Sequence, residues 1–153
     1  TRFWPVSRMR RPKQFLSISS SGESLIQATA RRVEKLSGDI PALVMTNELH
    51  KALVAEHLPH ADITCEPVGR NTAASIGLAA VQLAHRFGNA VMVVLPADHA
   101  VSDEAALNRT LSRAVRVAAS EKMLVTVGIT PEGPNTGYGY IKRGAELGDS
   151  RVH

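Results

Sequence analysis

The run AVMVVLP, residues 90–96, constrains the fold most strongly because it is continuously apolar. Strands buried on both faces of a parallel sheet have this pattern, whereas strands with one solvated face alternate apolar and polar residues. We therefore expect residues 90–96 to form the central strand of a parallel sheet covered by helices.

Strand and helix patterns alternate along the rest of the chain. Residues at helical spacing predict four helices, at about 22–36, 47–57, 69–87 and 103–120. Short apolar or alternating runs predict three further strands, at 42–46, 62–66 and 123–129. This order predicts an α/β fold with a doubly wound, mostly parallel, Rossmann-like sheet and right-handed connections.

Two N-terminal caps and one C-terminal stop support these helix boundaries. Ser20 and Glu23 have the spacing of a capping box for the first helix. Asn47 is a suitable N-cap for the second helix. Gly88 follows the third helix, where glycine commonly ends a helix.

Composition predicts a single globular domain and excludes several classes of protein. With 153 residues, 44% of them apolar, the chain can bury a core. The net charge of +4 suggests nucleic-acid binding, but aromatic residues make up only 4% of the chain, too few to stack many bases. We therefore expect no nucleic-acid partner. No run approaches the roughly twenty apolar residues that span a membrane. The single cysteine, Cys65, cannot form an internal disulfide, which favours a cytoplasmic location.

Positive charge is concentrated in the first thirteen residues. They contain five basic residues and no acidic one, so their charge is +5. The other 140 residues have thirteen bases and fourteen acids, so their charge is −1. The five bases are Arg2, Arg8, Arg10, Arg11 and Lys13. Several converging cations suit a polyphosphate ligand. The alternative is a disordered basic tail.

The segment EPVGRNTAAS, residues 66–75, follows a predicted strand and opens a predicted helix. Gly69 permits close backbone approach, and Asn71 and Thr72 can cap the helix and donate hydrogen bonds, so the segment suits an anion or nucleotide. The Glu66 carboxylate could accept two hydrogen bonds from the Watson–Crick edge of guanine. The alternative is that Glu66 is a solvated acid and Asn71 an ordinary cap.

The motif LPADH, residues 95–99, places Asp98 at the carboxyl end of the predicted central strand. Ligands bind at this edge of α/β sheets, and a carboxylate there suits Mg²⁺ shared with phosphates. Asp98 could instead cap the next helix, but Ser102 and Asp103 lie closer to its start. His99 is interpreted as a packing or hydrogen-bonding residue, because no second histidine or cysteine lies at metal-ligand spacing.

Five motifs in order from Thr1 to Ile141 resemble bacterial mannose-1-phosphate guanylyltransferases, a group of the sugar-phosphate nucleotidyltransferase family. They are TRFWPVSR, PKQFL, EPVGRNTA, LPADH and TGYGYI. The resemblance implies transfer of GMP from GTP to mannose 1-phosphate, giving GDP-mannose and pyrophosphate. Two alternatives stay open: transfer to another sugar 1-phosphate, and a non-catalytic module that binds a nucleotide or a protein partner. A homo-oligomer is also left open.

The resemblance assigns roles residue by residue. It implies that Arg2 and Lys13 are the catalytic phosphate-binding pair, with Arg8 as a supporting cation. It makes Asp98 the first of two metal-binding aspartates. The remaining implied residues contact the nucleotide or the sugar: Glu66, Gly69, Arg70, Asn71 and Thr72 lie in the nucleotide region, and Gly137, Tyr138 and Gly139 in the loop that closes on the sugar.

The family's pattern also extends beyond this sequence at both ends. In the family, a glycine-rich loop and a first strand precede the T-R-x-x-P motif, whereas this sequence starts at that motif with Thr1. The second metal-binding aspartate of the family is not found in residues 1–153. We therefore expect residues 1–153 to be the N-terminal, nucleotide-binding portion of an N- and C-terminally incomplete catalytic domain. In isolation this portion is expected to be inactive or unstable, because loss of an inner strand leaves unpaired backbone.

Overall fold

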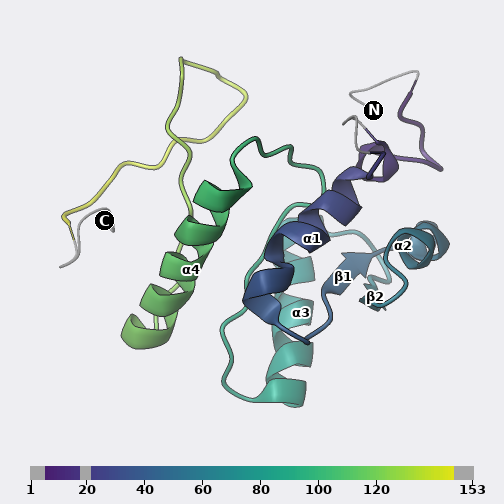
Figure 1. Cartoon of the computed structure of the whole chain (residues 1–153), viewed down its shortest axis with the longest axis horizontal. Coiled ribbons are helices and arrows are strands. Elements are labelled where there is room, and N and C mark those ends of the chain that lie inside the picture. The colour runs from purple at the N-terminus through teal and green to yellow at the C-terminus, as the bar shows by residue number, and fades with distance from the viewer. Residues whose placement is uncertain (1–5, 18–21, 147–153) are drawn as a thin grey trace.

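The computed structural model of the chain describes residues 6–17 and 22–146 (Figure 1). Helices and strands alternate through most of this part, as the sequence predicts. In chain order the elements are the 3-10 helix η1 (Lys13–Phe15), α1 (Leu25–Ser37), β1 (Leu43–Thr46), α2 (Lys51–His57), β2 (Asp62–Cys65), α3 (Asn71–Phe87) and α4 (Glu104–Glu121).

The sheet of the described residues consists of β1 and β2, which are parallel. Their register runs from Leu43 opposite Asp62 to Thr46 opposite Cys65. One backbone hydrogen bond extends the pairing at its carboxyl end, where the Glu66 amide donates to the Thr46 carbonyl at 2.7 Å. The connection through α2 makes a βαβ unit, the building block of the predicted fold.

Helix α1 begins with a capping box, but at a different serine from the one predicted. The Ser24 hydroxyl accepts from the Gln27 amide, and the Gln27 side chain accepts from the Ser24 amide at 2.9 Å. The prediction that Ser20 and Glu23 form the box is wrong, because the helix starts at Leu25 and the cap must directly precede it. Glutamine can fill the third position of a capping box as glutamate does.

The other predicted helix ends are partly confirmed. Asp103 caps α4, accepting a hydrogen bond from the Ala106 amide at 2.8 Å, and Gly88 ends α3 with a φ of 68°. Asn47 is not the cap of α2. Its side chain instead accepts from the His50 amide at 3.0 Å, within a turn that precedes the helix.

The buried core lies between η1, α1 and α2. Phe15, Ile26 and Val54 are almost inaccessible to solvent and form one cluster. Partly buried apolar side chains surround it, namely Val44, Leu53, Leu58, Ile63 and Ala97. Ala97 is important for the site, because it attaches the segment after residue 90 to the same core as η1.

The strands predicted at 90–96 and 123–129 do not form in the structure. Val94 is 52% exposed and Leu124 is fully exposed, and neither segment pairs with β1 or β2. A strand requires a neighbour to satisfy its backbone hydrogen bonds, and a continuous apolar run is buried only where helices cover both faces of a sheet. In the described residues, these two segments have neither a neighbouring strand to pair with nor a sheet covered by helices on both faces. The two-stranded sheet therefore corrects the prediction of a larger sheet with 90–96 at its centre.

Among the described helices, none combines the length and apolar character needed to cross a membrane.

Candidate functional site

Lys13 and Asp98, from two motifs far apart in the sequence, meet in an ion pair between Nζ and Oδ2. Lys13 is held by η1, in which the Leu16 amide donates to the Lys13 carbonyl at 3.0 Å and the neighbouring Phe15 is buried in the core. Asp98 follows Ala97, which packs against the same core. Two of the predicted site residues are thus brought together by a shared hydrophobic anchor.

The pair is partly open to solvent, with the Lys13 side chain 35% exposed and the Asp98 side chain 25% exposed. Ion pairs this accessible contribute about 0–1 kcal/mol to stability, so the groups are not committed to holding the fold. An ammonium can bind a phosphate oxygen, and a carboxylate can bind a hard cation. The geometry therefore combines an anion-binding and a cation-binding group in one place.

The described residues fit a metal that is shared with a ligand. They include no group of three or more His, Cys, Asp or Glu side chains able to enclose a metal ion. Mg²⁺ is commonly bound by one or two carboxylates together with substrate phosphates and water. Asp98, a partly exposed carboxylate next to a lysine, meets that requirement.

The basic segment is folded where the structure describes it. Arg8 and Arg11 exchange two backbone hydrogen bonds of 3.0 Å, which close a tight turn directly before η1. Residues 8–11 are exposed, whereas Ser7 is buried. The alternative of a disordered tail is wrong for residues 6–17, and Arg2 lies outside the described residues.

Glu66 is half-buried at the carboxyl end of β2, where its backbone continues the ladder to Thr46. The following Gly69 and Arg70 are exposed and lead into α3. The predicted capping role of Asn71 is wrong: Arg70 holds the N-cap position, and no side chain caps the helix there. The first amides of α3 consequently lack a side-chain cap, and such helix starts bind anions. Asn71 and Thr72 are both exposed at this end.

The loop of residues 130–140 is organised around Asn135. Its side chain accepts from the Gly137 amide at 2.9 Å, and its backbone amide donates to the Tyr140 hydroxyl at 2.6 Å. Tyr138 is 69% exposed. The hydrogen bonds found for this loop in the described part of the chain stay within residues 133–140, and none reaches Lys13 or Asp98.

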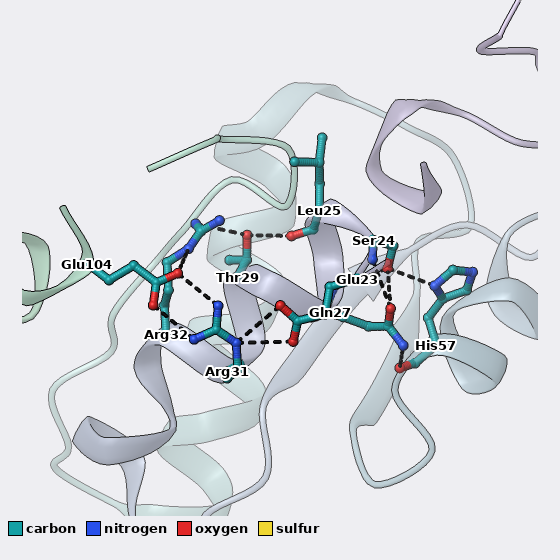
Figure 2. Close-up of polar contacts among 9 residues, drawn as sticks. All are labelled: Glu23, Ser24, Leu25, Gln27, Thr29, Arg31, Arg32, His57 and Glu104. Carbon is teal, nitrogen blue, oxygen red and sulfur yellow. Dashed lines mark hydrogen bonds and ion pairs between the residues drawn. The ribbon is translucent and has the colours of Figure 1, made fainter. Parts of the chain in front are cut away.

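A network of ion pairs that the sequence reasoning missed joins α1 to α4 (Figure 2). Glu104 accepts two hydrogen bonds of 2.9 Å from Arg31 and one of 3.3 Å from Arg32. The hydrogen bonds from Arg31 hold the pKa of Glu104 below its ordinary value. A sequence signal was available for Arg32, which lies seven residues after Leu25 and therefore on the apolar stripe of the helix.

A parallel βαβ unit, a helix start without a side-chain cap after β2 and a lysine–carboxylate pair are features found in α/β proteins that bind nucleotides. The chain belongs to the Nucleotidyl transferase family, whose profile matches residues 1–153. The family generally uses a divalent metal.

Individual relatives narrow the comparison. The chain is 44% identical over 152 residues to a mannose-1-phosphate guanylyltransferase of Salmonella montevideo, covering 96% of this chain and 31% of the relative. It is 42% identical over 157 residues to the xanthan biosynthesis protein XanB of Xanthomonas campestris pv. campestris (strain B100), covering 99% of this chain and 33% of the relative. The resemblance inferred from the five motifs is thereby confirmed.

A solved structure supports the fold class. The crystal structure described as a mannose-1-phosphate geranyltransferase from Thermus thermophilus superposes with a TM-score of 0.69 at 33% sequence identity. The match covers 78% of this chain and 35% of that one. The nucleotidyltransferase fold with a parallel sheet is confirmed, and the chain spans about a third of the length of the curated relatives it matches.

Proposed function

We propose that the protein carrying this chain transfers GMP from GTP to mannose 1-phosphate, producing GDP-mannose and pyrophosphate. The observation that carries the proposal is the contact between Lys13 and Asp98, which joins the PKQFL and LPADH motifs into one phosphate- and cation-binding site. The names of the curated relatives support the choice of nucleotide and sugar. Residues 1–153 then form the N-terminal, nucleotide-binding portion of the catalytic domain.

The reaction needs no side-chain general base. An oxygen of the mannose phosphate, already anionic near neutral pH, attacks the α-phosphorus of GTP in line with the leaving group. A bond forms between that oxygen and the α-phosphorus, and the bond from the α-phosphorus to the bridging oxygen breaks. The electron pair leaves with pyrophosphate.

The residues of this chain act by positioning and by neutralising charge. Lys13 and Arg2 bind phosphate oxygens on which charge grows, and such contacts are stronger in the transition state than in the ground state. Arg8 adds a further cation. Asp98 would hold Mg²⁺, which when bound neutralises phosphate charge and helps to align the reacting groups.

Substrate selection is assigned to two segments. Glu66 is proposed to accept hydrogen bonds from guanine, and the start of α3, with Gly69, Arg70, Asn71 and Thr72, to bind the rest of the nucleoside. The proposed sugar-closing residues are Gly137, Tyr138 and Gly139. The hydrogen bonds described for their loop are internal to it, so the choice of sugar is supported by the relatives' names and not by a contact with Lys13 or Asp98. Transfer to another sugar 1-phosphate is therefore the second candidate.

The wider setting is proposed on the same basis. A biosynthetic transferase of soluble nucleotide and sugar-phosphate substrates is expected in the cytoplasm, without a nucleic-acid partner. Assembly into a homo-oligomer is compatible with the reaction.

The direct test is an assay of the full-length protein with GTP, mannose 1-phosphate and Mg²⁺, with GDP-mannose measured by chromatography. Parallel reactions replace mannose 1-phosphate by glucose 1-phosphate. Formation of GDP-mannose alone supports the proposal. Preference for the other sugar would establish the second candidate, and absence of transfer with either would refute both.

A further inference from the structure

Arg32 is a buried charged residue of the described chain, with only 6% of its surface exposed. A buried guanidinium costs several kcal/mol unless its donors are paired. Here each of its three nitrogens has a partner. Nε donates to Glu104 Oε1 at 3.3 Å, Nη1 lies 3.5 Å from the Thr29 hydroxyl, and Nη2 donates to the His99 carbonyl at 3.0 Å. The arginine therefore connects α1 with both α4 and the segment that carries Asp98.

The hydrogen bond from Arg32 to the His99 carbonyl is important because the backbone around His99 makes few other hydrogen bonds. Among the described residues, no backbone–backbone hydrogen bond involves residues 89–102. Leu95 and Val101 line a cavity beside α1, and between them three consecutive residues hold the segment: Ala97 by packing on the core, Asp98 by its ion pair with Lys13, and His99 by its carbonyl on Arg32. The side chain of His99 is exposed, so it is the backbone of this residue that is used.

The local environment strengthens the bond from Arg32. A small cavity of about 60 Å³ with a mostly apolar lining lies beside it, between α1, Pro96, His99 and Leu107. Charge-assisted hydrogen bonds are stronger in surroundings of low polarity than in water. Glu104 balances the charge of the arginine, and Arg31 binds the same carboxylate from the outer side (Figure 2).

We propose that Arg32 is a positioning residue for Asp98: by binding the carbonyl of the next residue, it fixes the direction in which the Asp98 carboxylate faces Lys13 and a divalent cation. This inference rests on the proposed function for the identity of the cation and its role. The position of the backbone is a property of the fold, and it can be measured separately.

Arg31 offers a matched control. Arg31 and Arg32 are adjacent on α1 and both bind Glu104, but only Arg32 binds the His99 carbonyl. Arg31→Met and Arg32→Met therefore each remove one arginine from the Glu104 network, and only the second releases the segment after Asp98. Arg32→Lys keeps the positive charge but cannot bind three partners with one planar group.

The first readout is cation binding by the full-length protein with GTP and without sugar phosphate. Mn²⁺ replaces Mg²⁺ and is followed by electron paramagnetic resonance. We expect Arg32→Met to weaken Mn²⁺ binding about tenfold, which corresponds to loss of one charge-assisted hydrogen bond. Arg31→Met should change it less than about twofold, as expected for an exposed ion pair. Arg32→Lys should lie between them.

The second readout is limited proteolysis with thermolysin, in which the rate of cleavage within residues 97–101 is followed by mass spectrometry in the same full-length proteins without metal or nucleotide. Arg32→Met should accelerate this cleavage about tenfold relative to Arg31→Met, because a released segment opens more often. If Arg32→Met does not fold, Arg32→Lys supplies the comparison. Equal Mn²⁺ binding and equal cleavage rates in the Arg31 and Arg32 variants would overturn the positioning role. A wild-type protein that makes no GDP-mannose would refute the proposed function, while the cleavage comparison would still decide the role of Arg32.

Discussion

Lys13 and Asp98 form an ion pair although they come from opposite sides of the βαβ unit in the sequence. Neither belongs to a long helix or a strand. Both are positioned by a neighbour in the chain that packs on the Phe15 core, so a mutation in that core would disturb the two groups together. Substitution of Lys13 and Asp98 themselves should separate catalysis from stability.

Lys13→Ala in the full-length protein should lower kcat about a hundredfold or more, the loss typical of one preorganised donor to a developing charge. The KM for GTP should rise less, because the contact strengthens in the transition state. Steady-state kinetics measures both constants. Lys51→Ala, an exposed lysine at the start of α2, is the control and should behave as wild type. A KM effect larger than the kcat effect would make Lys13 a simple binding residue.

Asp98→Asn should abolish most turnover while changing the free energy of unfolding by about 1 kcal/mol or less, since the substitution is close to isosteric and the ion pair is partly exposed. Chemical denaturation and a Mg²⁺ titration of activity measure the two effects. Wild-type dependence on Mg²⁺ in Asp98→Asn would place the cation elsewhere.

Glu66→Gln should reduce the preference for GTP over UTP and dTTP by about 1–3 kcal/mol, the usual cost of leaving a buried polar partner unpaired. Competition assays with pairs of nucleotides give this ratio directly. The backbone of Glu66 should remain in place, because its amide bonds the Thr46 carbonyl independently of the side chain. An unchanged ratio in the variant would remove Glu66 from base recognition.

Sequence patterns predicted the parts of this fold that depend on neighbours close in the chain. The helices α1, α3 and α4 and the strands β1 and β2 follow from local periodicity, and Asp103 and Gly88 begin or end helices as predicted. The capping box is formed by Ser24 and not by the predicted Ser20, because the serine-rich sequence before α1 offers several candidates for the N-cap. Local chemistry alone does not choose among them.

The features that depend on distant partners were predicted less well. Residues 90–96 have the composition of a buried strand, but pairing requires a second strand, which composition does not provide. Motif resemblance assigned Lys13 to phosphate binding and Asp98 to metal binding, but it did not predict the ion pair between them. The arginine network was missed because charged helix residues are usually solvated, and only the packing of α4 on α1 makes Arg32 buried.

The α1–α4 network predicts how the chain responds to acid. Hydrogen bonds from Arg31 lower the pKa of Glu104 in the folded state, so the carboxylate stabilises the fold when ionised. This contribution is complete above the pKa of an unfolded glutamate, about 4.3, and is lost as the pH falls from there through the lowered folded pKa.

The measurement for this last prediction is the free energy of unfolding of wild type and Glu104→Gln between pH 7 and 3. The difference between them should be constant near neutrality and should shrink below about pH 4.3, where the unfolded chain takes up a proton that the folded carboxylate resists. Arg31→Met provides the control, because it should raise the pKa of Glu104 and reduce the pH-dependent part of the difference. A difference that stays constant down to pH 3 would show that Glu104 does not gain stability from its arginine partners.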